Sequence, residues 1–313
     1  MLELRKDYIL DRWVIAASVR GKRPKEFKQE GKATEPKLCV FCPGNEHLTP
    51  PEIGRVEKDG KWVLRWFPNK FPFVEQKGSA RVKTKNKFFT SAAAYGKHEV
   101  IADTNDPNKQ LWDMPQSHIK LLLDVIKQRI TSLERLTSIK YALAFKNHGE
   151  KAGTSIIHSH VQVVGFSQVP PSIKELVNAA KKYKKCPYCD IVKIEAKSKR
   201  KCFDNKTFLA FAPYASRFNY EVWVFPKKHI KNLEELSDKE MADLAEIVHK
   251  ILVKLRKLNF SYNLYLNHSP EKENLHFHIE VTPRIATWAG FEFSSDITIN
   301  SVMPEEAAQY YRS

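Results

Sequence analysis

The chain carries one sequence pattern twice. Each half opens with a C-x-x-C pair, CVFC at 39–42 and CPYC at 186–189. In each half the pair is followed by a strand-like run, a long amphipathic stretch and a second strand-like run. An alternating segment comes last, HSHVQVVG in the first half and HFHIEVTP in the second. A pattern that recurs in the same order is typical of a repeated structural unit. We therefore expect two tandem units, 1–167 and 168–313.

The periodicity of each half predicts the elements of the unit. Apolar residues recur at helical spacing near 115–137 and 238–258. Two capping-box signals mark the expected helix starts: Ser237 with Glu240, and Asp113 with Gln116. Alternating runs predict strands at 98–103, 142–149, 220–225 and 263–269. Because hairpin-length turns join most of these strands, we expect an α+β fold in which each antiparallel sheet carries one long helix.

The charge balance favours phosphate-bearing partners. Lysine and arginine number 52 against 36 aspartates and glutamates, a formal net charge of +16. The lysine-rich segments 181–185 and 197–201 lack the interleaved aromatic platform of a nucleic-acid surface, so we interpret them as a solvated linker surface. Neither a membrane-spanning stretch nor a secretory signal is evident, and a cytoplasmic protein with neither nucleic-acid nor membrane partners is expected.

The paired cysteines indicate metal rather than disulfides. Four of the five cysteines lie in the two C-x-x-C pairs, and histidines follow each pair along the chain. In a cytoplasmic chain such pairs belong to metal or redox sites, and one pair would suffice for redox chemistry. Two pairs with downstream histidines fit zinc better.

Three polar side chains of the first alternating segment are expected on one face. Residues two apart on a strand share a face, which aligns His158, His160 and Gln162 while Ile157 and Val161 pack behind them. Two ordinary core histidines would be the simplest interpretation, but a row this polar is costly to bury without partners. Glutamine is a poor zinc ligand. The combination suggests that His158 holds metal with Cys39 and Cys42, His160 does chemistry, and Gln162 positions a polar group. His278 is interpreted as structural, and so are His98, His118, His148, His249 and His268.

Several segments in the right order resemble the galactose-1-phosphate uridylyltransferase family, a branch of the histidine-triad superfamily built from two such units. They cover almost the whole chain: RWVIAASVRGKRP, CVFCPGNEHLTPPE, WFPNKFP, NHGEKAGTSIIHSHVQ, GFEF and PEEAAQYYR. The resemblance implies two histidine-triad-like units and a ping-pong transfer. His160 would attack the α-phosphorus of a nucleotide sugar and form a covalent nucleotidyl-histidine. A hexose 1-phosphate would leave, and a second one would then accept the nucleotide.

The resemblance also implies roles for the neighbouring residues. Gln162 would donate a hydrogen bond to phosphoryl oxygens, since a departing sugar phosphate needs no acid. Ser155 would help to orient His160 or contact phosphate. The implied contacts to nucleotide, phosphate and sugar are Arg20, Arg23, Asn69, Asn147, Gly153, Thr154, Ser155, Gln162, Phe291 and Glu292. In the family the last two reach across a dimer interface, so a homodimer is implied.

Three departures from the family pattern limit this interpretation. Ser159 replaces the usual proline of His-Pro-His-x-Gln, and a serine at this position resembles the ADP-glucose phosphorylase branch. An enzyme that uses an adenine nucleotide, with inorganic phosphate as the acceptor, is therefore an alternative. A lysine that some relatives carry before GFEF is missing. The second half offers a full zinc set, whereas Pro107 stands in the first half where the second has a histidine. The second-half set is Cys186, Cys189, His229 and His276.

For the first-half site, Asp106, Asn108, His47 or a water could replace the missing ligand, or the site could be empty. A zinc protein that binds nucleotides without turnover is a further alternative, for which the charge and the two cysteine pairs are the support. A hydrolase of dinucleoside polyphosphates is the weakest alternative, because Gln162 argues against it.

Overall fold

The computed structural model describes residues 2–17 and 38–313. Its strands are β1 (Leu2–Lys6), β2 (Trp13–Ala17), β3 (Gly54–Lys58), β4 (Lys61–Pro68), β5 (Lys83–Lys85), β6 (Phe89–Ser91), β7 (Gly96–Ala102), β8 (Tyr141–His148), β9 (His160–Phe166), β10 (Lys201–Asp204), β11 (Phe208–Phe211), β12 (Val222–Pro226), β13 (Tyr262–Asn267), β14 (His278–Pro283) and β15 (Thr298–Asn300). Its helices are α1 (Gln116–Glu134), α2 (Pro171–Ala180), α3 (Pro187–Glu195), α4 (Asp238–Leu258), α5 (Gly290–Ser295) and α6 (Pro304–Arg312).

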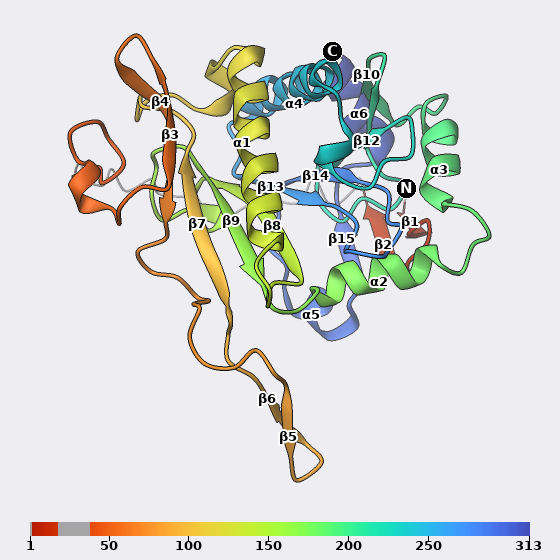
Figure 1. Cartoon of the computed structure of the whole chain (residues 1–313). Coiled ribbons are helices and arrows are strands. Elements are labelled where there is room, and N and C mark those ends of the chain that lie inside the picture. The colour runs from red at the N-terminus through yellow and green to blue at the C-terminus, as the bar shows by residue number, and fades with distance from the viewer. Residues whose placement is uncertain (1, 18–37) are drawn as a thin grey trace.

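The two halves share one antiparallel sheet. Its order is β10-β11-β12-β14-β13-β8-β9-β7-β4-β3, ten strands in all (Figure 1). The halves meet where β13 pairs with β8, with Asn263 opposite Asn147. Each half therefore continues the hydrogen-bond ladder of the other, and the predicted α+β fold is confirmed.

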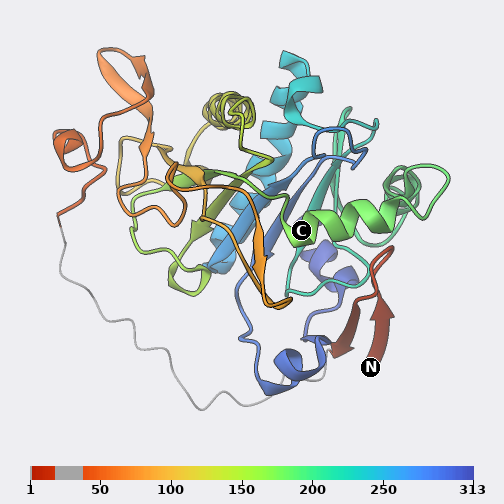
Figure 2. The same ribbon diagram turned by 60° about the horizontal axis from the view of Figure 1, so that its bottom comes forward.

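The amino-terminal strands pack on the other half of the chain. β1 pairs with β2, and β2 pairs in parallel with β15, so that Val14 lies opposite Thr298. Arg5 on β1 donates to Glu305 on α6 at 3.1 Å. Figure 2 shows β1 and β2 beside these carboxyl-terminal elements. The predicted division into 1–167 and 168–313 stays a prediction, with this small sheet joining residues from both ranges.

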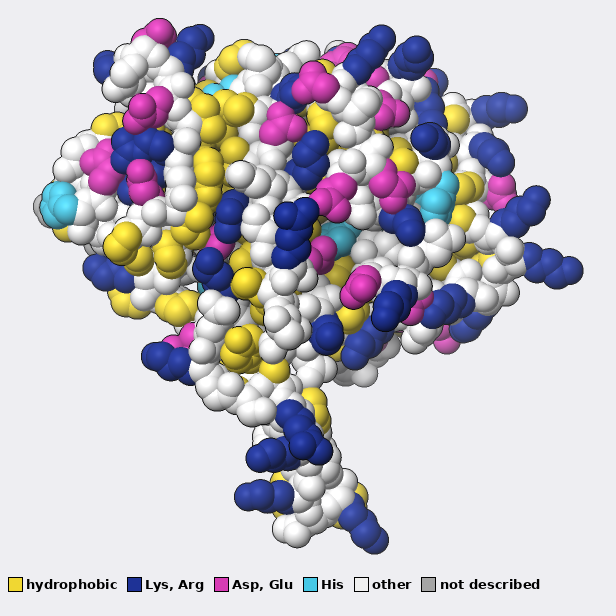
Figure 3. Space-filling model, viewed as in Figure 1, with side chains coloured by type: hydrophobic (Ala, Val, Ile, Leu, Met, Phe, Trp, Pro, Cys, Tyr) yellow, Lys and Arg dark blue, Asp and Glu magenta, His cyan; other side chains and the backbone are white. Residues whose placement is uncertain are grey.

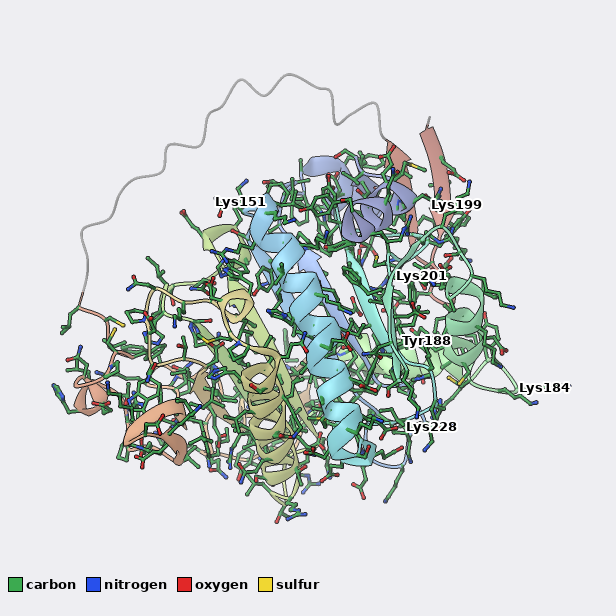
Figure 4. The ribbon with its side chains drawn as sticks, turned by 90° about the horizontal axis from the view of Figure 1, so that it is seen from above. Lys151, Lys184, Tyr188, Lys199, Lys201 and Lys228 are labelled. Carbon is green, nitrogen blue, oxygen red and sulfur yellow. The ribbon has the colours of Figure 1, made fainter. Side chains whose placement is uncertain are left out.

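The long helices lie side by side over one face of the sheet. Figure 4 shows α1 and α4 from above, one over each half. Their apolar sides, with residues such as Ile126 and Ile251, form a single core with Val161 and Val163 of β9. The predicted helix at 238–258 is confirmed at both ends, and the one near 115–137 is found at 116–134.

The described residues pack differently on the opposite face of the two halves. In the second half α2 and α3 pack on this face, around a cluster that includes Leu176, Phe211 and Trp223. In the first half the same face carries a smaller cluster around Phe41 and Phe67. This difference leaves room for a site in the first half.

Two local predictions are wrong. Asp113 does not cap α1 together with Gln116; its carboxylate accepts from the backbone N–H of Gln110 at 3.0 Å, and Pro115 precedes the helix. Ile157 does not pack behind the histidines, because β9 begins only at His160; its side chain is 79% exposed.

A hairpin of β5 and β6 projects from the body of the molecule (Figure 1). Its turn exposes Phe88 and Phe89 beside several lysines, and Figure 3 shows this basic arm. Lys184, Lys199 and Lys201 lie on the outer side of the second half, around α3 (Figure 4). Within the described residues, no helix has the length and hydrophobicity needed to cross a bilayer.

Candidate active site

His160 lies at the start of β9 with one ring nitrogen fixed and the other free. Its Nδ1 is 2.8 Å from the carbonyl oxygen of His158, so Nδ1–H donates and the lone pair is on Nε2. The Nε2 atom has no hydrogen-bond partner among the described residues. The Phe41 ring packs edge-on at 5.5 Å, and burial lowers the pKa of His160. A neutral imidazole with a free Nε2 can act as a nucleophile.

Gln162 lies two residues along the same strand, and a neighbour from β7 holds its side chain. Because Val100 of β7 is opposite Gln162, the cross-strand register brings His98 close as well. His98 Nε2 is 2.8 Å from Gln162 Oε1, and the amide nitrogen of Asn69 lies 3.1 Å from the same Nε2 and 3.5 Å from Nδ1. The Phe73 ring lies 4.5 Å from the His98 ring. The polar row of the first half is therefore continued on two adjacent strands.

Residues from the second half brace the loop that follows β8. Asn263 Nδ2 donates to Asn147 Oδ1 at 2.8 Å and to the carbonyl oxygen of Ala152 at 2.9 Å. The Arg284 guanidinium in turn donates to Asn263 Oδ1. Gly149 takes φ +82°, and a Cβ there would lie 2.2 Å from Ser261 Oγ, so only glycine fits this approach. The loop that follows β8 is therefore positioned by both halves.

A buried ion pair lies beneath the histidine segment. Lys146 Nζ on β8 is 2.8 Å from Asp103 Oδ2, 2.7 Å from Ser159 Oγ and 3.2 Å from the carbonyl oxygen of His160. Both charged side chains are at most 1% exposed. Ser159 thus has a specific partner at the position where the family pattern has proline.

A cavity of about 470 Å³ opens beside the loop that follows β8. Lys151, Ala152 and Gly153 line it from the first half, and Arg284 and Trp288 line it from the second. Two further residues lie on α5, whose Phe293 also lines the cavity: Phe291, 45% exposed, and Glu292, which accepts from the Ala289 N–H at 3.0 Å. Elements distant in sequence thus form one wall.

The first cysteine pair comes together with His158. Its Nδ1 lies 3.2 Å from Cys39 Sγ and 3.7 Å from Cys42 Sγ. Zinc bonds of about 2.3 Å to sulfur and 2.0 Å to nitrogen separate tetrahedral ligand atoms by roughly 3.5 Å. The Nε2 atom is 2.7 Å from the carbonyl oxygen of Thr104, which leaves Nδ1 unprotonated for a metal. The donors fit zinc, with these three ligands among the described residues.

The second cysteine pair forms a four-ligand cluster. His276 Nδ1 is 3.8 Å from Cys186 Sγ and 3.7 Å from Cys189 Sγ, and His229 Nδ1 is 3.5 Å from Cys189 Sγ. The Nε2 atoms of both histidines contact oxygens, at 3.1 Å for Pro226 and 2.9 Å for Asn274. These separations and tautomers fit a tetrahedral zinc site with two sulfur and two nitrogen ligands.

His278, the repeat counterpart of His160, is enclosed by neighbouring side chains. His278 donates from Nδ1 to the carbonyl oxygen of His276 at 3.0 Å, as His160 does to His158. Its ring, however, stacks on Phe225 at 4.6 Å, and its Nε2 is 3.4 Å from the buried Glu280 carboxylate. Glu280 also accepts from Tyr265 Oη at 2.7 Å. The ring of His278 is therefore enclosed by an aromatic ring and a carboxylate, unlike that of His160.

Comparison with known proteins agrees with this geometry. Residues 2–170 match the family model "Galactose-1-phosphate uridyl transferase, N-terminal domain", and residues 96–310 match a domain of unknown function. The galactose-1-phosphate uridylyltransferase of Thermotoga maritima is 30% identical over 100% of this chain and 98% of its own length. This chain belongs to the galactose-1-phosphate uridylyltransferase family.

Other members of the family resemble the chain equally closely. The ADP-glucose phosphorylase of Arabidopsis thaliana is 33% identical over 99% of this chain and 92% of its own length. A crystal structure of that phosphorylase with bound ADP-glucose superposes with a TM-score of 0.87 at 31% identity, over 100% of this chain and 98% of that one. The resemblance read from the motifs is thus confirmed, and the chain is an enzyme of this transferase family.

The family-derived site residues are brought together to different degrees. His160, Gln162, Asn69 and Asn147 lie on adjacent strands or the loops that continue them. Ser155 is exposed and makes no hydrogen bond to His160. Their roles stay predictions. Thr154 Oγ1 is buried without a partner in the described part of the chain. Arg20 and Arg23 lie outside the described residues.

Four contacts near the site were not foreseen from the family motifs. His98, which was interpreted as structural, contacts Gln162. Asn263 and Arg284 reach the site from the other half of the chain. Lys146, which contacts Ser159, lies outside the family motifs. Only the strand register and the sheet order bring them in. The sequence offered one signal for His98. It stands at the start of a predicted strand of the repeated pattern, so the face of the sheet on which its side chain lies could have been predicted.

Proposed function

We propose that the chain is a hexose-1-phosphate nucleotidyltransferase that works by ping-pong through His160, with exchange between UDP-glucose and a hexose 1-phosphate as its main reaction. The observation that carries the proposal is the ring of His160, whose Nδ1–H is fixed at 2.8 Å to a backbone carbonyl while Nε2 is free. Fixing one nitrogen keeps the nucleophilic lone pair on the other.

Each half-reaction exchanges one bond to phosphorus for another. In the first, Nε2 of His160 attacks the α-phosphorus, an N–P bond forms, and the P–O bond to the leaving hexose 1-phosphate breaks with its electrons staying on oxygen. In the second, a phosphate oxygen of the incoming hexose 1-phosphate attacks the same phosphorus and the N–P bond breaks. The proton on Nδ1 stays in place throughout.

Gln162 and the loop after β8 supply neutral donors for the charge that develops. The Gln162 amide is the donor proposed for the phosphoryl oxygens, with Asn147, Gly153, Thr154 and Ser155 nearby. Asn69 is proposed to contact the nucleotide, and Arg20 and Arg23 to neutralise the pyrophosphate. The cavity beside Gly153 suits the sugar phosphate. Phe291 and Glu292 on α5 are proposed to contact the sugar across the interface of a homodimer.

Zinc is proposed in both cysteine clusters, held by Cys39, Cys42 and His158 in one and by Cys186, Cys189, His229 and His276 in the other. There it would act as a structural cross-link between loops and strands. A cytoplasmic location and a boundary between two units near residue 167 belong to the same proposal.

A second candidate reaction is the phosphorolysis of ADP-glucose. It is favoured by Ser159, because serine at this position resembles the ADP-glucose phosphorylase branch, whereas the commoner family motif has proline. It also agrees with the likeness to the Arabidopsis thaliana phosphorylase. The covalent chemistry at His160 would be the same, with inorganic phosphate as acceptor.

The decisive experiment is intact-mass spectrometry of the protein after incubation with UDP-glucose or ADP-glucose. We expect a uridylyl adduct from UDP-glucose that disappears when a hexose 1-phosphate is added. An adduct from ADP-glucose alone, removed by phosphate, would select the second candidate. His160→Asn should abolish either adduct, while His249→Asn on the surface of α4 is the matched control. Absence of any adduct on the wild-type protein would contradict both candidates.

A further inference from the structure

His98 is buried beside the proposed phosphate donor and belongs to no metal cluster. We infer that His98 is a positioning residue that fixes which end of the Gln162 amide faces the substrate. The inference rests on the proposed function, because it assigns Gln162 its polarity in that reaction.

The hydrogen bonds run in one direction from the backbone to Gln162. The Phe71 N–H, which can only donate, is 2.9 Å from Asn69 Oδ1, so the Asn69 NH₂ group must face the His98 ring. That group is 3.5 Å from His98 Nδ1 and 3.1 Å from Nε2. The shortest contact of the ring is from Nε2 to Gln162 Oε1, at 2.8 Å, so we assign the ring proton to Nε2 and the lone pair that accepts from the Asn69 NH₂ group to Nδ1.

The proton on Nε2 then decides the orientation of the glutamine. His98 Nε2 is 2.8 Å from Gln162 Oε1, and an amide oxygen only accepts. The NH₂ group of Gln162 is thereby left free to donate. Reversing the amide would point its oxygen at the phosphoryl group and its NH₂ at a ring N–H, which is repulsive at both ends.

Burial makes this arrangement persistent. His98 is 3% exposed, and the Phe73 ring lies 4.5 Å away on its face. Burial lowers the pKa of His98, which keeps the ring neutral near pH 7. Because removing one donor from an oxyanion site costs about 10²–10³ in rate, disordering its orientation should cost about 10-fold or more.

The test is a double-mutant cycle on the single-turnover rate of adduct formation from the donor that labels the wild type. His98→Phe keeps a ring but removes the Nε2–H, and Gln162→Ala removes the donor. We expect H98F to slow adduct formation at least 10-fold with little change in donor KM. In the Q162A background, H98F should cause no further loss, because His98 acts only through Gln162.

His98→Asn keeps an amide donor and should retain more of the rate than H98F; it also replaces H98F in the cycle if that variant does not fold. Additive losses from the two sites, or a loss confined to KM, would overturn the inference while leaving the proposed function intact. Absence of a wild-type adduct would instead remove the proposed function, and the inference with it.

Discussion

At the scale of single residues, a buried ion pair between Lys146 and Asp103 lies beneath the candidate site. Lys146 contacts Asp103, Ser159 and the main chain of His160 at once. A buried ammonium with several oxygen partners holds the strand segment more firmly than the apolar contacts around it could, because each donor has a direction. The position of His160, the proposed nucleophile, is therefore expected to depend on a lysine that is itself buried.

Lys146→Met should lower the free energy of unfolding by about 3–5 kcal/mol, since it leaves the Asp103 carboxylate buried without a counter-charge. Urea denaturation followed by tryptophan fluorescence would measure it. The double variant with Asp103→Asn removes both charges and should regain a large part of the loss. A single variant as stable as the wild type would show that the pair contributes little.

At the scale of elements, the two long helices are positioned in different ways. Ser237 Oγ accepts from the Glu240 N–H at the start of α4, and the Glu240 carboxylate accepts in return from the Ser237 N–H at 2.9 Å. The start of α1 lacks such a cap, but Arg129 within it donates to the fully buried Glu99 of β7 at 2.8 Å. α4 is thus defined by its own sequence, and α1 by the sheet beneath it.

Ser237→Ala should lower the free energy of unfolding by about 1 kcal/mol, because it removes the cap of α4. Ser132→Ala is the control, since Ser132 lies inside α1 and alanine favours a helix interior. Equal effects of the two substitutions in urea denaturation would exclude a specific role for the cap.

This contrast explains what the sequence could predict. The bounds of α4 and the two C-x-x-C pairs follow from spacing within short segments, and these were accessible. The histidines that join each pair lie far away in sequence and were found from the repeated pattern and the family resemblance. The cap predicted for α1 was wrong because the Asp113 carboxylate accepts from the Gln110 N–H instead, and Pro115 precedes the helix. The contacts of His98 with Gln162 and of Asn263 with Asn147 depend on which strands become neighbours, and no local pattern encodes that.

At the scale of the whole molecule, the two halves share one sheet, and each half has its own cluster of cysteine and histidine side chains. The second has four protein ligands, and the first has three among the described residues. A complete ligand set closes a zinc site, so the second cluster should contribute more to stability than the first.

Cys186→Ser and Cys39→Ser should each lower the zinc content by one equivalent per chain, with the larger drop in melting temperature for Cys186→Ser. Elemental analysis and thermal denaturation would measure both effects. Cys202→Ala changes the one cysteine outside the clusters and should leave the zinc content unchanged. Full zinc content in either cluster variant would contradict the assignment.

The junction of β8 with β13 has a consequence for how such a protein can be made and inherited. A solitary half would present a long bare strand to solvent, and unpaired backbone groups of that kind recruit other chains into aggregates. Neither half could be separated from the other unless another element covered the exposed edge of β8 or β13. We therefore expect the two halves to be retained together, although the reaction is proposed only at His160 in the first half.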